Sequence, residues 1–300
     1  MLGLHLITVE TRCFPAAFRS AAGWRQFLAA YQTTLAGWSP PARPRVVGTR
    51  FGRTRLQECG PAEAPPLILL HGFASTSTMW APTVAALGRR FHIWAPDTLG
   101  DVGLSEPARW PRGRADYVLW LTDVLAELGV ARARFVGFSY GAWLALALAA
   151  AQPACVEQLA LLDAAGFVPV HGPVMLAAAA VSLSHSRRLI EAVGRAFHTD
   201  YHPRTVYDEQ FLCGLEHFRR RGWVLPAPLR DGELRGLASP VLALWGAADP
   251  TMDTRQALAR AQRLVPQLEA DLLAGAGHGV YLEADRVNPR LLTFLSDGQG

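Results

Sequence analysis

The chain has 300 residues, of which 50% are hydrophobic, and a formal net charge of +4 at neutral pH. This length and apolar share suit one large α/β domain with an insertion. The basic residues are mostly arginines scattered along the chain without interleaved aromatic residues, which excludes nucleic acid as the expected partner.

The cysteines and the N-terminus bear on the compartment. Cys13, Cys59, Cys155 and Cys213 lie far apart, without a Cys-x-x-Cys pair or a histidine at ligand spacing. We therefore expect reduced thiols and no structural zinc. The N-terminal residues lack the basic region and cleavage site of a signal peptide, and no apolar run reaches the roughly 18 residues that span a bilayer. These features predict a cytoplasmic protein without a membrane span.

Residues 1–44 are predicted to be an N-terminal extension that packs on the main domain. Residues 18–35 have helical periodicity, and a proline-rich stretch at 39–44 follows them. Residues 46–59 then alternate polar and apolar side chains, which predicts a β-hairpin that turns around Phe51 and Gly52.

From residue 66 onward the pattern changes to strands followed by helices. Short apolar runs of strand length occur at residues 66–71, 91–95, 134–138, 158–163 and 241–245. Helical stretches lie near residues 79–90, 114–129, 140–152, 253–264 and 284–296. This alternation predicts an α/β fold with a mostly parallel central sheet, helices on both faces and ligands at the carboxyl ends of the strands.

The segment Gly137-Phe-Ser-Tyr-Gly141 follows a strand and leads directly into an alanine- and leucine-rich helix. Gly-x-Ser-x-Gly in this context is typical of a nucleophile elbow, a sharp turn that lifts the serine off the end of the sheet. The turn strains the serine backbone and leaves room for little beyond glycine at Gly137 and Gly141. Ser139 is therefore the predicted nucleophile.

Two backbone N–H groups are predicted to bind a developing oxyanion. The first belongs to Tyr140, at the N-terminus of the helix after the serine, where the helix dipole favours negative charge. The second belongs to Phe73, in the loop after the first parallel strand, where Gly72 permits a close approach. We expect the Tyr140 side chain to be a pocket-wall or packing residue without a chemical role, and His71 to orient this loop rather than to act as a base.

The predicted base is His278, because small residues surround it in Gly275-Ala-Gly-His-Gly279, just after a strand-like stretch at 268–273. The predicted orienting acid is Asp249, in the loop after the strand at 241–245. Asp163, at the end of another strand, is the rival for this role. Asp253 is expected to cap the following helix instead.

The order Ser, Asp, His and five motifs resemble the α/β-hydrolase fold family, and more narrowly its bacterial carboxylesterase-like members. The motifs are His71-Gly-Phe73, Asp97-Thr-Leu-Gly-Asp-Val-Gly-Leu-Ser105, Gly137-Phe-Ser-Tyr-Gly141, Trp245-Gly-Ala-Ala-Asp249 and Gly275-Ala-Gly-His278. The likeness runs from about residue 45 to the C-terminus, apart from the middle insertion. It implies a hydrolase that needs no metal or organic cofactor, with Ser139 as nucleophile, His278 as base and Asp249 as orienter.

Two departures from the family pattern lie outside these three residues. The stretch after Asp97, which we expect to organise its loop, has one residue more than the common Asp-x-x-Gly-x-Gly-x-Ser. Ala142 replaces a second glycine that is frequent after the elbow. Because of both departures, the substrate of a better-known relative should not be assumed for this protein.

Residues 166–238 interrupt the strand and helix repeat and are predicted to form a helical cap or lid over a core of residues 45–165 and 239–300. Residues 173–183 are strongly apolar, which indicates an apolar acyl or alcohol group in the substrate, although this face could equally pack on the core. Phe211, Trp80 and Trp143 are possible pocket residues, with core packing as the alternative. The run of arginines at 219–221 is expected to be a solvated helix end.

The sequence predicts a serine hydrolase that cleaves a carboxylic ester of a small to medium, partly apolar substrate through an acyl-enzyme. A lactone or thioester hydrolase, peroxide-dependent acyl transfer on the same triad, and a ligand-binding homologue with little turnover remain alternatives. The expected partner is a small-molecule ester, and no cofactor or metal is expected. Whether the protein is a monomer or a homo-oligomer is left open.

Overall fold

The computed structural model describes residues 15–197, 206–222 and 224–297. Within these residues, nine strands form one sheet, in the order β1-β2-β4-β3-β6-β7-β8-β9 with β5 paired to β2. The strands are β1 (Arg43–Thr49), β2 (Gly52–Cys59), β3 (Pro66–Leu70), β4 (His92–Pro96), β5 (Glu106–Pro107), β6 (Ala133–Phe138), β7 (Val156–Leu162), β8 (Val241–Gly246) and β9 (Leu268–Leu273). The strands from β4 to β9 along this order pair in parallel, whereas β1, β2 and β5 pair antiparallel. The predicted α/β fold and hairpin are confirmed.

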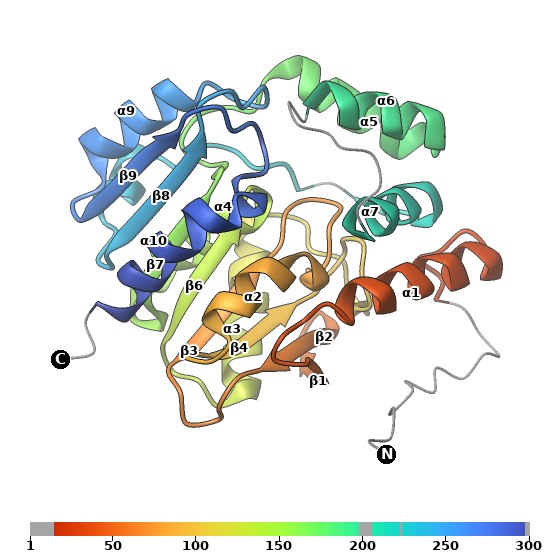
Figure 1. The fold of residues 1–300 in the computed structure, drawn as a ribbon, viewed down its shortest axis with the longest axis horizontal. Coiled ribbons are helices and arrows are strands. Elements are labelled where there is room, and N and C mark those ends of the chain that lie inside the picture. Colours follow the sequence, from red (N-terminus) through yellow and green to blue (C-terminus); the bar gives the residue numbers. More distant parts are fainter. Residues whose placement is uncertain (1–14, 198–205, 223, 298–300) are drawn as a thin grey trace.

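Helices cover both faces of the sheet (Figure 1). They are α1 (Ala21–Leu35), α2 (Ala81–Leu87), α3 (Arg114–Leu128), α4 (Tyr140–Ala151), α5 (Gly172–Ser184), α6 (Arg187–Phe197), α7 (Val206–His217), α8 (Asp231–Arg235), α9 (Thr254–Leu264) and α10 (Ala284–Ser296). Buried residues of α3, α4 and α9 share one apolar cluster with the sheet, and those of α2 and α10 share another. The two clusters form the core on opposite faces of the sheet.

Helix α4 lies at the centre of the molecule. Residues 140–149 are all buried, as expected for a helix that is apolar on every side. Its N-terminus follows β6 directly, so the elbow lies at the carboxyl end of a central strand. The carboxyl ends of β3, β7, β8 and β9 lie at the same edge, because these strands run parallel to β6.

Helix α1 starts three residues later than the predicted helix, because the Ser20 side chain caps it by accepting a hydrogen bond from the Gly23 N–H at 3.0 Å. It packs along α7 (Figure 1). Phe18 and Phe27 on this side are buried in a third apolar cluster that also contains residues of α5, α6 and α7. The N-terminal residues described here are therefore part of the packed structure.

The surface prediction for the arginines at 219–221 holds for Arg219 and Arg221, which are exposed, but it is wrong for Arg220 and for the helix. Helix α7 ends at His217, and the arginines at 219–221 follow it in a loop rather than forming a solvated helix end. The side chain of Arg220 is only 10% exposed, because it makes an ion pair with the buried Asp101. A basic residue of the predicted solvated group therefore belongs to the interior.

The structure also bears on the state of the cysteines and on membrane spans. Cys59, Cys155 and Cys213 are free thiols, and Cys13 lies outside the described residues. Burial raises the pKa of Cys59 and of Cys213 to about 12, so both are protonated at neutral pH. In the part of the chain that the structure describes, no helix is both long and apolar enough to cross a membrane.

Candidate active site

Ser139 occupies the turn between β6 and α4 with a φ of 51° and a ψ of −107°. A non-glycine residue rarely adopts this conformation, so the surroundings must impose it. A Cβ on residue 137 would lie 2.6 Å from the Ala142 backbone, and one on residue 141 would lie 2.0 Å from the Leu70 carbonyl oxygen. Only glycine fits at Gly137 and Gly141, as the elbow prediction requires.

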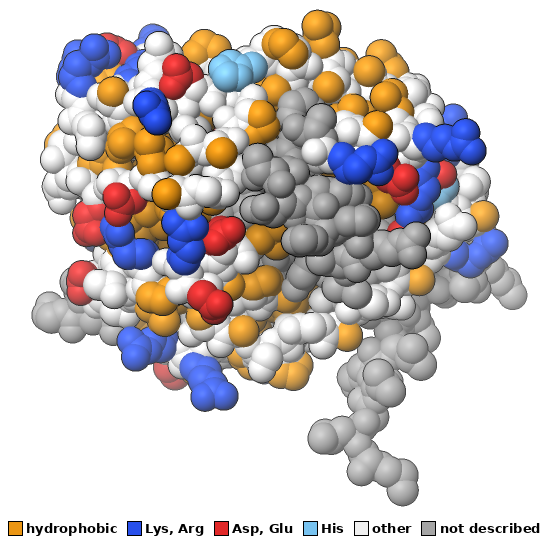
Figure 2. Space-filling view, turned by 45° about the horizontal axis from the view of Figure 1, so that its top comes forward, with side chains coloured by type: hydrophobic (Ala, Val, Ile, Leu, Met, Phe, Trp, Pro, Cys, Tyr) orange, Lys and Arg blue, Asp and Glu red, His pale blue; other side chains and the backbone are white. Residues whose placement is uncertain are grey.

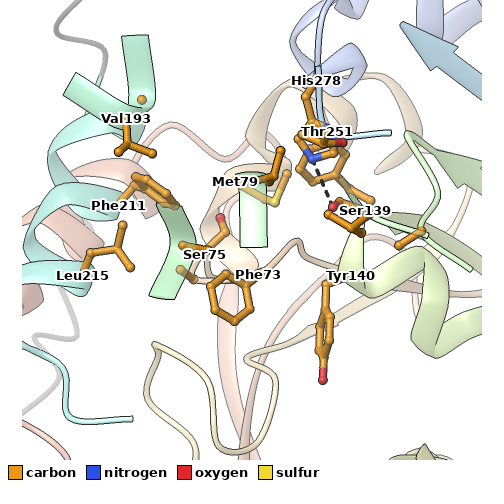
Figure 3. Close-up of a pocket in the computed structure, with 18 of the residues that line it drawn as sticks. Phe73, Ser75, Met79, Ser139, Tyr140, Val193, Phe211, Leu215, Thr251 and His278 are labelled. Atoms are coloured by element: carbon orange, nitrogen blue, oxygen red, sulfur yellow. Dashed lines mark hydrogen bonds between the residues drawn. The ribbon is translucent and has the colours of Figure 1, made fainter. Parts of the chain in front are cut away.

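The structure brings the three predicted residues Ser139, His278 and Asp249 together. His278 Nε2 lies 3.1 Å from Ser139 Oγ, the contact drawn as a dashed line in Figure 3. On the other side of the imidazole, Nδ1 lies 2.8 Å from Asp249 Oδ2. A carboxylate at this position favours a proton on Nδ1, which leaves Nε2 to accept the proton of the serine hydroxyl.

Burial and neighbouring charges shift the pKa values of His278 and Asp249 in opposite directions. Burial favours neutral imidazole, but the charge and hydrogen bond of Asp249, together with the charge of Asp163, raise the pKa of His278 above its ordinary value of 6.5. Burial also disfavours the Asp249 carboxylate, yet the charge of His278 and the hydrogen bonds it receives lower the pKa of Asp249 below 3.8. The arrangement therefore keeps Asp249 ionised beside the imidazole at neutral pH.

Asp163, the rival acid, also lies near His278 but makes different hydrogen bonds from those of Asp249. Its Oδ1 accepts a hydrogen bond from the Gly246 N–H at 2.8 Å, and its Oδ2 accepts from the Gly279 and Val280 N–H groups at 2.7 and 2.9 Å. These bonds tie the loop that carries His278 to the end of β8. Complete burial raises the pKa of Asp163 to about 6. Its contacts are those of a side chain that positions the histidine loop.

Ligand atoms of Asp163, Asp249 and His278 lie within 4.8 Å of one another, a spacing that could hold a metal ion. The hydrogen bonds argue for a different use. Both oxygens of Asp163 accept backbone N–H groups, and Asp249 divides its oxygens between the imidazole and the Thr251 N–H, which lies 2.7 Å from Oδ1. A cation would have to displace these donors.

Phe73 and Tyr140 both lie beside Ser139 in Figure 3. The loop of Phe73 is organised by His71, whose Nδ1 lies 2.8 Å from the Gly72 carbonyl oxygen and whose Nε2 accepts from the Thr98 N–H at 2.8 Å. This geometry makes His71 a side chain that orients the loop, as predicted. The Tyr140 N–H belongs to the first turn of α4, where backbone donors have no partner within the helix.

The side chain of Tyr140 is 6% exposed, and its hydroxyl donates to the Val224 carbonyl oxygen at 2.9 Å. It therefore packs against its neighbours, in agreement with the prediction. Asp97 organises its own loop in the predicted way: its carboxylate accepts from the Ser77 N–H at 2.9 Å and from the Leu104 N–H at 2.8 Å. Asp253 caps α9 by accepting from the Gln256 N–H at 2.9 Å.

A cavity of about 550 Å³ lies beside Ser139 and His278. Most of its wall is apolar. Residues from α5, α6 and α7 form the side away from the serine, and Val193, Phe211 and Leu215 line this side in Figure 3. Of the three aromatic residues considered from the sequence, Phe211 lines the cavity, whereas Trp80 and Trp143 are buried in the core.

The apolar helix α5 has an inner and an outer face. On the inner face, Met175, Ala178 and Val181 line the cavity, so this face does not merely pack on the core. On the outer face, Leu176 and Leu183 are 72% and 81% exposed. Figure 2 shows hydrophobic side chains gathered over this part of the surface.

Comparison with known proteins agrees with this geometry. A family profile described as "Alpha/beta hydrolase family" matches residues 67–290. The chain belongs to this family. It is 31% identical over 289 residues to carboxylesterase YbfK of Bacillus subtilis (strain 168). This alignment covers 94% of this chain and 97% of YbfK.

Solved structures extend the likeness of this hydrolase to its backbone. The crystal structure of carboxylesterase CesB (YbfK) from Bacillus subtilis superposes on this chain with a TM-score of 0.88. The superposition covers 93% of this chain and 100% of the CesB chain. Naproxen esterase from the same organism has a TM-score of 0.85 at 29% identity and covers 91% of this chain and 98% of that one. The protein is thus an α/β-hydrolase of the carboxylesterase type, an enzyme that acts on ester bonds.

Three residues that contact the predicted site residues or their loops were not identified from the sequence. Thr251 donates its N–H to Asp249, and its hydroxyl oxygen lies 3.2 Å from His278 Nδ1. Its position two residues after Asp249 is the one local signal that could have pointed to it. Asp101 and Arg220, which contact the loop of Phe73, carry no such signal, although Asp101 lies in the lengthened stretch after Asp97.

Proposed function

We propose that this hydrolase cleaves carboxylic esters of small to medium, partly apolar substrates through a Ser-His-Asp acyl-enzyme mechanism. The observation that carries the proposal is the continuous chain from Ser139 Oγ through His278 to Asp249, with contacts of 3.1 and 2.8 Å, beside an apolar cavity. A serine hydroxyl becomes a useful nucleophile when a neighbouring base accepts its proton, and His278 is positioned to be that base.

In the first step, Ser139 Oγ attacks the ester carbonyl carbon while His278 Nε2 takes the hydroxyl proton. The Phe73 and Tyr140 N–H groups donate to the oxyanion of the tetrahedral intermediate, and Asp249 stabilises the imidazolium. Collapse of the intermediate breaks the bond to the leaving oxygen. His278 gives its proton to that oxygen, so the alcohol leaves and the acyl group stays on the serine.

In the second step, a water molecule takes the place of the alcohol. His278 removes a proton from the water as its oxygen attacks the acyl carbon, and the same two N–H groups bind the second oxyanion. When this intermediate collapses, His278 returns the proton to Ser139 Oγ. The carboxylic acid is released and the free enzyme is restored.

The substrate class follows from the wall of the cavity. Because that wall is largely apolar, it favours an acyl or alcohol group with apolar surface, and its volume of about 550 Å³ suits a small to medium molecule. We also propose that residues 166–238 act as a cap on a core of residues 45–165 and 239–300. The position of α5, α6 and α7 across the cavity from Ser139 supports this division.

The test compares the wild type with Ser139→Ala on p-nitrophenyl acetate, butyrate and octanoate, with folding checked by circular dichroism. Loss of the nucleophile is expected to lower kcat by roughly 10⁴- to 10⁶-fold on every ester. Ser296→Ala is the matched control, since Ser296 does not line the cavity, and it should keep wild-type activity. Equal turnover by wild type and folded Ser139→Ala would overturn the proposal.

A covalent probe provides a second readout that does not depend on the substrate chosen. A fluorophosphonate reacts with an activated serine and leaves a stable adduct. Mass spectrometry of the digested protein is expected to find this adduct on Ser139 alone. A wild-type protein that hydrolyses the esters but carries the adduct on another serine would contradict the assignment of the nucleophile.

A further inference from the structure

The lengthened stretch after Asp97 places a carboxylate against the loop of Phe73. Asp101 is 3% exposed, and its Oδ2 accepts a hydrogen bond from the Ala74 N–H at 3.0 Å. Its Oδ1 accepts from the Val102 N–H at 2.6 Å. Ala74 is the residue directly after Phe73, so the carboxylate holds the peptide unit that links the two.

The backbone at this point requires support. Ala74 has a φ of 59°, in the left-handed region that residues with a side chain seldom occupy. A hydrogen bond from its N–H to a buried carboxylate is stronger than one between neutral groups. Asp101 is therefore placed to stabilise this conformation of the loop.

Arg220 approaches the same loop from the segment after α7. Its Nη2 donates to Asp101 Oδ1, and its guanidinium carbon lies 3.9 Å from the centre of the Phe73 ring. The Arg220 side chain is only 10% exposed. One guanidinium thus contacts both the carboxylate that holds the Ala74 N–H and the side chain of Phe73 (labelled in Figure 3).

Oxyanion donors stabilise a transition state most when they already point at the developing charge and need no reorganisation. We propose that Asp101 and Arg220 form a positioning pair that holds the Phe73 N–H in place for the oxyanion and couples it to the proposed cap. This inference rests on the proposed function, because it takes Phe73 as an oxyanion donor to an ester attacked by Ser139. Neither side chain is assigned contact with the reacting atoms.

The experiment measures kcat and KM on p-nitrophenyl butyrate, and the rate of Ser139 phosphonylation, for four variants. They are Asp101→Asn, Arg220→Met, Arg220→Lys and the double variant Asp101→Asn/Arg220→Met. Because loss of a whole oxyanion donor lowers kcat on the order of 100- to 1000-fold, a displaced donor is expected to cost about 10- to 100-fold. KM should change by less than about threefold, and the phosphonylation rate should fall in parallel with kcat. Arg220→Lys keeps the charge and should recover part of kcat.

The double variant separates positioning from simple charge balance. A single substitution removes one member of this buried ion pair and keeps the charge of the other, which lowers stability, whereas the double variant removes both charges and should regain melting temperature. If the pair positions the donor, kcat of the double variant stays low although its stability recovers. If a single variant does not fold, the double variant carries the test.

Arg134→Met is the matched control, because the Arg134 side chain, at the start of β6, is only 4% exposed, pairs with Glu157 of β7 and lies outside the cavity. It should lose melting temperature and keep kcat. The inference is overturned if folded Asp101→Asn and Arg220→Met keep wild-type kcat, if the double variant regains it, or if Arg134→Met loses it equally. Failure of the proposed function looks different: the wild type would then lack phosphonylation at Ser139 or turn over esters without that serine.

Discussion

At the level of individual side chains, His278 shows how its surroundings set the chemistry available to it. The imidazole is the predicted base, and a base must be neutral to accept the Ser139 proton. Burial favours that neutral form, but the carboxylates of Asp249 and Asp163 outweigh burial and raise the pKa of His278. Protonation therefore begins at a higher pH than for an ordinary histidine.

The pH dependence of kcat/KM follows from this shift. Because the pKa is raised, activity is expected to fall as pH is lowered through a midpoint above 6.5, the ordinary value. Asp249→Asn removes the neighbouring charge, so it should lower this midpoint and also reduce kcat on the order of 10⁴-fold. Both are measured by initial rates between pH 5 and 9 at constant ionic strength.

Asp271→Asn is the control for this measurement, because Asp271 has a side chain that is 58% exposed and lies outside the cavity. It should leave the midpoint unchanged. A wild-type rate that stays flat from about pH 5 to 8 would count against His278 as the base.

At the level of elements, the elbow depends on close contact between the first turn of α4 and the end of β3. A Cβ on residue 141 would lie 2.0 Å from the Leu70 carbonyl oxygen and 2.6 Å from that of His71. Both are backbone atoms, which cannot move away as a flexible side chain would. The helix and strand can therefore approach this closely only through Gly141, and this approach places the N-terminus of α4 at Ser139.

Gly141→Ala is expected to lower the free energy of unfolding by about 1–3 kcal/mol, the usual cost of overpacking, and to reduce kcat because the start of α4 must shift. Gly232→Ala in α8 is the matched control, since nothing lies within 4 Å of its added Cβ. Alanine favours a helix over glycine, so this variant should be as stable as wild type or slightly more so. Urea denaturation and steady-state kinetics measure both effects, and a Gly141→Ala variant with wild-type stability and kcat would contradict the argument.

At the level of the whole molecule, α1 joins regions that are distant in the sequence. Phe27 is fully buried in the apolar cluster that also contains Leu212 and Leu215 of α7. One turn further along the same helix, the Tyr31 hydroxyl donates to Asp97 Oδ2 at 3.1 Å, within the loop that follows β4. The N-terminal helix, the segment at 166–238 and the sheet thus share buried contacts, which favours unfolding as one unit.

Phe27→Ala is expected to lower the free energy of unfolding by roughly 3–5 kcal/mol, because it removes a large buried ring and leaves a cavity. Leu183→Ala, at a side chain that is 81% exposed, should change it by less than about 0.5 kcal/mol. Urea denaturation followed by circular dichroism and tryptophan fluorescence measures both. A Phe27→Ala cost below about 1 kcal/mol, or two separate transitions by the two probes, would contradict unfolding as one unit.

Much of the fold was accessible from local sequence. The predictions for the parallel strands differ from the observed strands by at most two residues at either end, because a strand buried on both faces needs a short continuous apolar run. The elbow was equally local: Gly137, Ser139 and Gly141 lie within five residues, and backbone geometry dictates their types. The order of Ser139, Asp249 and His278 at three strand ends was enough to predict that they meet, since parallel strands end at one edge.

Contacts between distant segments needed the folded structure. Arg220 and Asp101 are separated by 119 positions, and the sequence around Arg220 predicted a solvated helix end. Asp163 and the Gly279 N–H are separated by 116 positions, and the sequence left that carboxylate as a rival acid. The physical reason is that sequence pattern reports which backbone conformation a segment favours and which face it buries. The partner of a buried charge depends instead on which side chains the packed helices and loops bring within hydrogen-bond distance, and that arises from the whole fold at once.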